Sequence, residues 1–135
     1  MHGVLADEQH DDEVAAGGLD AAQRAFDLLS AAPSPLRFEG QDIEGLPAPL
    51  ELPALKRWLL RDGTPRAVRD AAWRSLTRRA RTDGPAWVVA AVGIAMPGLR
   101  RKAGLLARGW QGETADLDAE LLAGFLERLR TIDLD

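Results

Sequence analysis

The longest apolar run of the chain is AWVVAAVGIAMPGL, residues 86–99, and it limits the possible folds more than any other segment. The run is shorter than the roughly 20 apolar residues that a membrane-spanning helix needs, and Gly93, Pro97 and Gly98 interrupt it. A helix over this run is apolar on nearly every side, which is typical of a helix buried in a protein core. We therefore expect a central buried helix. Pro97 should either kink this helix or separate it from a second segment, 99–108.

Several other segments predict helices that can cover the central one. Apolar residues recur at helical spacing in residues 20–31, 52–61 and 65–81, and Thr64 is expected to cap the third of these helices. Residues 36–47 contain glycine and proline and are expected to form an extended loop. We predict an all-α protein, a compact bundle of five or six short helices that ends in a helical hairpin.

The amino-terminal segment differs from the rest. Residues 1–18 are acidic and lack any periodicity, so we expect a disordered acidic tail followed by a single helical domain, 19–135. His2 and His10 lie in this tail, where histidines are more often solvated than bound to a metal. The chain has no cysteine, which excludes disulfides and thiolate metal sites. We predict neither a metal site nor a cofactor.

Charge is distributed unevenly along the chain. Residues 1–55 contain 11 acidic and 2 basic side chains, and residues 56–110 contain 3 acidic and 13 basic ones. Residues 111–135 are acidic again, with 7 acidic and 2 basic side chains. A basic centre of this kind indicates either an anionic partner or neutralisation by the acidic ends within the fold, and the sequence leaves both interpretations open.

The last segment, beginning near residue 114, predicts an amphipathic helix. Asp116, Glu120 and Glu127 fall on one side of its helical wheel, and we call these three residues the acidic ridge. The opposite half is apolar and is expected to be buried; it consists of Leu117, Leu121, Leu122, Phe125, Leu126, Leu129 and Ile132. The preceding helix is the nearest partner, so we expect a hairpin over 96–135 with Trp110 near its turn. The ridge is either a docking surface for a basic helix or an ordinary solvated face.

Residues 96–133, MPGLRRKAGLLARGWQGETADLDAELLAGFLERLRTID, are similar to the start of region two of bacterial RNA polymerase sigma factors. In that family an arginine-bearing helix and a turn precede a helix with a regular pattern of acidic and apolar residues. The matching residues here are Asp116, Leu117, Glu120, Phe125, Leu129 and Asp133.

The resemblance implies a partner, core RNA polymerase. In sigma factors this helix docks on the clamp helices of the largest polymerase subunit, so Asp116 and Glu120 would contact polymerase, assisted by Glu127. Ala119 departs from the family, which often has glutamine there. The segments that melt and read promoters do not follow residue 135, so we expect docking without promoter melting.

A second hypothesis is a DNA-binding helix-turn-helix, in which the arginine-rich helix 65–81 would enter the major groove. Basic residues of this helix and of the next helical segment could contact phosphates or guanine edges; they are Arg66, Arg74, Arg78, Arg81, Arg100, Arg101, Lys102 and Arg108. A third hypothesis is a helical interaction module or homodimer, and the oligomeric state remains open.

An enzyme is not expected. The chain has no glycine-rich phosphate loop, its only histidines lie in the tail, and none of Ser30, Ser34 and Ser75 stands near a plausible base. The first residues also lack the basic and apolar regions of a secretory signal. We expect a cytoplasmic protein that does not enter a membrane.

Overall fold

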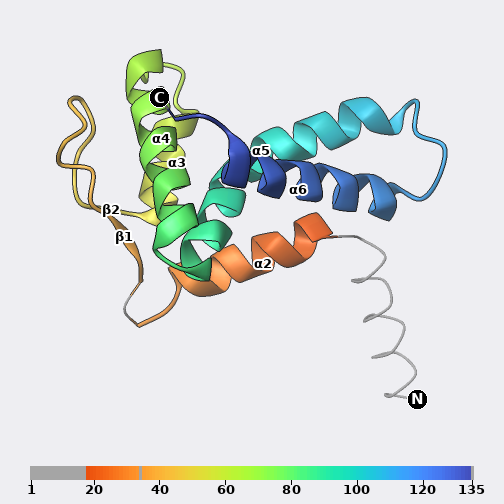
Figure 1. Ribbon diagram of the computed structural model, residues 1–135, viewed down its shortest axis with the longest axis horizontal. Helices are drawn as coiled ribbons and strands as arrows, with labels where there is room; N and C mark the ends of the chain where they lie inside the picture. The colour runs from red at the N-terminus through yellow and green to blue at the C-terminus, as the bar shows by residue number, and fades with distance from the viewer. Residues whose placement is uncertain (1–17, 34, 135) are drawn as a thin grey trace.

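The computed structural model describes residues 18–33 and 35–134. These residues form five helices and a two-stranded ribbon (Figure 1). The helices are α2 (Gly18–Ser30), α3 (Leu52–Leu60), α4 (Arg66–Thr82), α5 (Pro85–Ala107) and α6 (Thr114–Thr131), and the strands are β1 (Arg37–Phe38) and β2 (Leu50–Glu51). The predicted all-α bundle is confirmed. The predicted tail falls on residues 1–17, which lie outside the described part, and Gly18 belongs to α2 instead of the tail.

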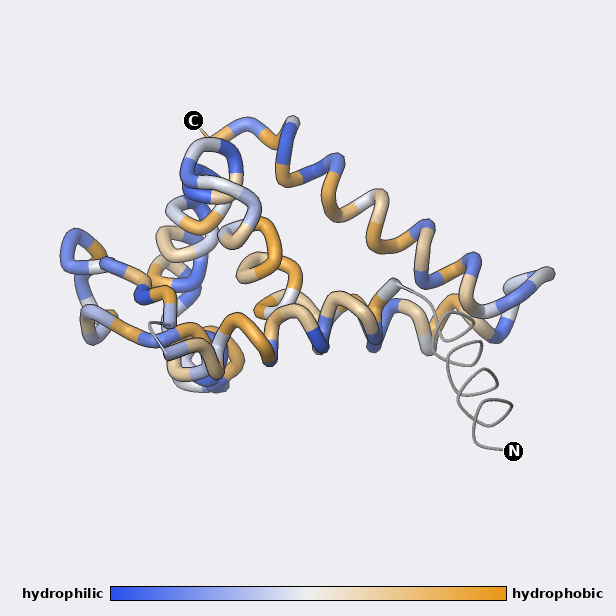
Figure 2. The backbone as a smooth tube through the Cα atoms, turned by 90° about the horizontal axis from the view of Figure 1, so that it is seen from below, coloured by the Kyte–Doolittle hydropathy of each residue, from blue (hydrophilic) through white to orange (hydrophobic). Residues whose placement is uncertain are grey.

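Helix α5 is the central element, as the apolar run predicted. It packs against α2, α3, α4 and α6. Its residues 90–94 are all buried, and Figure 2 shows how strongly apolar this part of the chain is. Pro97 lies inside a continuous helix, so the two predicted segments form one element. None of the described helices has the length and apolar character needed to cross a membrane.

Helix α2 packs against α5 at Gly93, where the side chain of Phe26 lies directly on the backbone of α5. A Cβ atom added to Gly93 would lie 2.0 Å from Cδ1 and 2.6 Å from Cβ of Phe26. Phe26 is itself buried, at 3% exposure. The packing of α2 on α5 therefore requires a residue without a side chain at position 93.

The core has two parts. The larger part joins α3, α4, the first half of α5, the ribbon and Phe26 of α2; its other buried members include Phe38, Leu52, Leu55, Ala72, Leu76, Ala90 and Ile94. The smaller part joins α2, the middle of α5 and α6; its buried members are Leu19, Val92, Met96 and Leu99. The first part fixes the amino-terminal half of α5, and the second part seats the hairpin.

The expected extended loop contains a strand, so that prediction was incomplete. Arg37 pairs with Glu51 and Phe38 pairs with Leu50 in an antiparallel register. Phe38 is fully buried, which holds the ribbon against the core. A pairing of two residues per strand is too short to produce the alternation by which strands are recognised in a sequence.

Thr64 does not cap α4, contrary to prediction. Its Oγ1 donates a hydrogen bond to the carbonyl oxygen of Trp58, at 2.5 Å, and the residue is buried. The carbonyl of Pro65 instead accepts hydrogen bonds from the first turn of α4. The hydroxyl of Thr64 therefore fixes the turn between α3 and α4.

The apolar half of α6 is less buried than predicted. Leu117 and Leu129 are buried, Ile132 is 39% exposed, and the four apolar residues between them are only half-buried. Helix α6 packs along α5 and α2 and reaches α4 near its carboxyl end. The alternating hydropathy of α6 is visible along its length in Figure 2. The apolar half of α6 therefore remains partly exposed to solvent.

Candidate functional site

The second half of α5 and the whole of α6 form the predicted hairpin. Figure 1 shows α6 running back alongside α5 after the turn 108–113. The indole Nε1 of Trp110 donates a hydrogen bond to the carbonyl oxygen of Glu113, at 3.0 Å, and that same carbonyl accepts the amide of Asp116. Trp110 lies in the turn, as predicted, and its hydrogen bond closes the turn and supports the start of α6.

The acidic ridge stands on the outer side of α6. Asp116, Glu120 and Glu127 are all exposed. Glu127 forms an ion pair with Arg130, one turn later on the same helix. The side-chain carboxylates of Asp116 and Glu120 make no hydrogen bond or ion pair with any residue in the described part of the chain. Two of the three carboxylates are thus available to an external cation.

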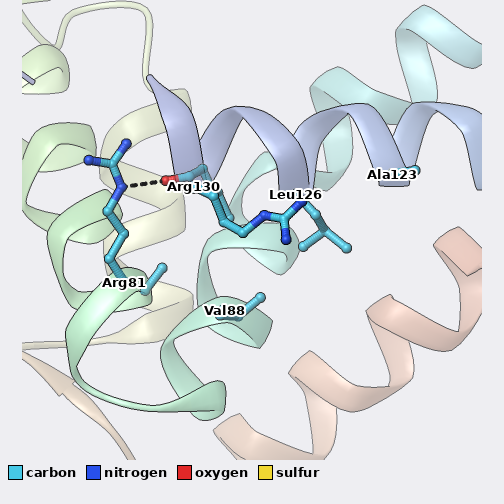
Figure 3. Close-up of a pocket in the computed structure, with 7 residues that line it drawn as sticks. Arg81, Val88, Ala123, Leu126 and Arg130 are labelled. Atoms are coloured by element: carbon cyan, nitrogen blue, oxygen red, sulfur yellow. Dashed lines mark hydrogen bonds between the residues drawn. The ribbon is translucent and has the colours of Figure 1, made fainter. Parts of the chain in front are cut away.

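The carboxyl end of α6 is held by arginines of α4. Arg81 donates from Nε to the carbonyl of Leu129, at 2.6 Å, and from Nη2 to the carbonyl of Ile132. Arg74 donates from Nε to the carbonyl of Leu134, at 3.1 Å. Figure 3 shows the first of these bonds. The last carbonyls of a helix lack intrahelical partners and carry partial negative charge, so guanidinium groups stabilise this end of α6.

This arrangement gives the arginines of α4 an internal role that the sequence did not reveal. Arg69 donates to the carbonyl of Arg61, and Arg79 donates to the carbonyl of Glu39 at 3.3 Å while lying over the ring of Trp87. Four arginines of one helix therefore bind backbone carbonyls of the same chain. All of their partners lie outside α4, which is why a helical wheel of that helix could not identify them.

The remaining predicted nucleic-acid contacts fall into two separate groups. Arg66 and Arg78 on α4 are exposed, and their guanidinium groups have no hydrogen bond or ion pair among the described residues. Arg101 and Lys102 on α5, and Arg108 directly after it, are exposed. Figures 1 and 2 place α4 and the hairpin turn at opposite ends of the molecule, so these cations do not form one continuous surface.

A charged cluster joins α2, α5 and α6 beneath the ridge. Arg100 of α5 forms an ion pair with Asp20 of α2, at 2.8 Å. Asp118 of α6 is half-buried beside them. Burial raises the pKa of Asp118, Asp20 raises it further, and Arg100 opposes the shift. The sequence signal for this cluster was the position of Asp118 on the apolar side of the helical wheel.

Apolar residues are exposed where α5 enters the turn. Leu105 is 65% exposed, Leu106 is 44% exposed and Trp110 is 37% exposed. The hairpin tip is a second surface on which a protein partner could pack.

Comparison of the chain with models of known protein families, with curated proteins and with solved structures gave no match. Among the described residues, histidine, aspartate and glutamate do not gather into a group that could hold a metal ion. The α5–α6 hairpin, which carries the exposed acidic ridge, is the candidate functional site.

Proposed function

We propose that the protein is a transcription-associated, sigma-factor-like protein whose α5–α6 hairpin docks on core RNA polymerase through the acidic ridge. The observation that carries the proposal is the exposure of Asp116 and Glu120, which are unpaired within the described residues. Carboxylates spaced along one side of a helix are complementary to a basic helix or coiled coil. Their positions match the acidic positions of the sigma pattern in residues 96–133.

The way α6 is held adds support. Trp110 fixes the turn before it, and Arg81 and Arg74 bind the carbonyls at its other end. A helix fixed at both ends loses little conformational freedom on binding, which favours association. The proposed role is contact with polymerase and not chemistry. Promoter melting is not part of it, because the resemblance covers only the docking segment.

The test is capture of purified core RNA polymerase by the immobilised full chain. The variant Asp116→Asn, Glu120→Gln removes two ridge charges and keeps the side-chain shapes. Its matched control is Asp42→Asn, Glu44→Gln, which removes two exposed charges from the loop between β1 and β2. We expect polymerase capture to fall at least tenfold in the ridge variant and to persist in the control. Equal capture by both variants, or no capture by the unchanged chain, would overturn the proposal.

DNA binding by α4 as part of a helix-turn-helix is the alternative. Its support is the pair of exposed, unpartnered arginines, Arg66 and Arg78. Arg74 and Arg81 bind carbonyl oxygens at the end of α6, so their side chains are less free to reach phosphates. These bonds weigh against DNA binding by α4. Retention of the chain on duplex DNA without polymerase, lost in the variant Arg66→Gln, Arg78→Gln, would favour this alternative.

A further inference from the structure

A pocket opens between α4, α5 and α6, beside the ridge. Its volume is about 420 Å³, within the range of small-molecule sites. Five apolar side chains and two arginines line it: Ala80, Arg81, Val88, Ala123, Leu126, Leu129 and Arg130. Figure 3 shows Val88, Ala123 and Leu126 around the opening. The pocket exists because α6 reaches α4 only near its end.

The two arginines give the pocket an excess of positive charge. In Figure 3, Arg130 extends along α6 towards Leu126, and Arg81 points to the end of α6. Arg81 binds neutral carbonyl oxygens, so its charge is not neutralised by them. Arg130 has one carboxylate partner, Glu127, in an ion pair whose two side chains are 57% and 73% exposed. Two guanidinium groups thus lie at the edge of an apolar pocket, and the ion pair of one of them, Arg130, is exposed to solvent.

We propose that this pocket binds a free aliphatic carboxylate, with its hydrocarbon chain against Val88, Leu126 and Leu129 and its carboxylate at Arg130. Apolar walls favour the hydrocarbon chain because it leaves water on binding. A guanidinium group matches a carboxylate geometrically, since it donates two parallel hydrogen bonds to the two oxygens. The site does not depend on the polymerase proposal, because neither Asp116 nor Glu120 lines the pocket.

The test is a titration of the isotope-labelled full chain with octanoate, followed by NMR of the methyl groups. We expect saturable shifts centred on Val88, Leu126 and Leu129. Hexanoate should bind about tenfold more weakly than octanoate, because each buried methylene contributes a factor of roughly three to four. Octanol, which has the chain without the charge, should also bind about tenfold more weakly.

Two pairs of variants locate the ligand. Ala123→Leu fills the pocket from the exposed side of α6 and should abolish the shifts, whereas Ala119→Leu, one turn earlier and outside the pocket, should not. Arg130→Gln should weaken octanoate about tenfold without affecting octanol. Arg128→Gln removes a charge from the same helix but outside this pocket, and it should leave octanoate binding unchanged.

Three results would overturn the proposal. The first is the absence of saturable shifts below the concentration at which octanoate self-associates. The second is equal binding of octanol and octanoate, which would indicate a nonspecific apolar crevice. The third is unchanged octanoate binding in Ala123→Leu, which would place the ligand elsewhere. Chain folding in each variant is checked from the methyl spectrum before ligand is added.

Discussion

The guanidinium group of Arg81 donates a hydrogen bond from Nε to the carbonyl oxygen of Leu129, which joins α4 to the end of α6 across 48 residues of sequence. A second bond from the same side chain reaches the carbonyl of Ile132. One arginine thus satisfies two carbonyls that the helix itself leaves without donors. This relationship fixes the carboxyl end of the proposed docking helix.

Replacing Arg81 with glutamine is expected to lower the free energy of unfolding by about 1 to 2 kcal/mol. The reason is the loss of charge-assisted hydrogen bonds to the partly buried carbonyl of Leu129. Urea denaturation followed by circular dichroism measures the change. Arg78→Gln is the matched control, since Arg78 is exposed on the same helix and its guanidinium group binds no described residue. An equal loss of unfolding free energy in both variants would show that removing a positive charge from α4, and not breaking the bond to α6, causes the destabilisation.

Gly93→Ala is expected to destabilise the chain by about 1 to 3 kcal/mol, the usual cost of overpacking a core. The added methyl group would overlap both the ring and the Cβ of Phe26, so rotation of that ring cannot relieve the clash. Gly98→Ala in the same helix is the control. It meets no atom within 4 Å and should stabilise α5 by up to about 1 kcal/mol. Thermal denaturation of both variants distinguishes the effect of packing from the effect of helix propensity. A change in Tm of the same sign in both variants would contradict the close approach of α2 to Gly93.

The sequence was sufficient to predict the class of fold and the hairpin. The apolar run identified α5 as the buried centre, and the wheel of α6 placed Asp116 and Glu120 on an exposed side. Both features depend on local periodicity, which can be read from the sequence of a single helix. The prediction that 96–135 forms a hairpin also followed, because a short turn between two helices leaves few other arrangements.

The tertiary use of polar side chains could not be predicted in the same way. Arg74 and Arg81 were assigned to nucleic acid because exposure and charge are all that a wheel can indicate. Their hydrogen bonds to the α6 end depend on how two helices meet. The pairing of Phe38 with Leu50 was missed for a similar reason, since it joins residues that local spacing does not relate.

Asp118→Asn is expected to raise the free energy of unfolding at neutral pH. The folded-state pKa of Asp118 lies above its ordinary value of 3.8, mainly because of burial, so the folded chain binds this proton more tightly than the unfolded chain does. Ionisation of Asp118 therefore costs stability above the raised pKa, and this cost disappears as the pH falls towards 3.8. Urea denaturation between neutral and acidic pH should show the advantage of asparagine shrinking on acidification. An advantage that grows on acidification would contradict the assigned direction, and Asp42→Asn in an exposed loop is the control.

The last prediction separates docking on polymerase from self-association. We expect the purified chain to sediment as a monomer at low and at moderate salt, because we propose that the acidic ridge binds polymerase and not a second copy of the chain. If the ridge instead bound the cations Arg101, Lys102 and Arg108 of a second copy, an oligomer would form at low salt. That oligomer would dissociate as ions screen charges over roughly 10 Å at 0.1 M. A different result would be an oligomer that persists at moderate salt but is lost in the variant Leu105→Ser. It would indicate a homodimer formed through the exposed hairpin tip, because screening by salt does not weaken apolar contacts. Sedimentation velocity at two salt concentrations therefore identifies which surface of the hairpin meets a partner.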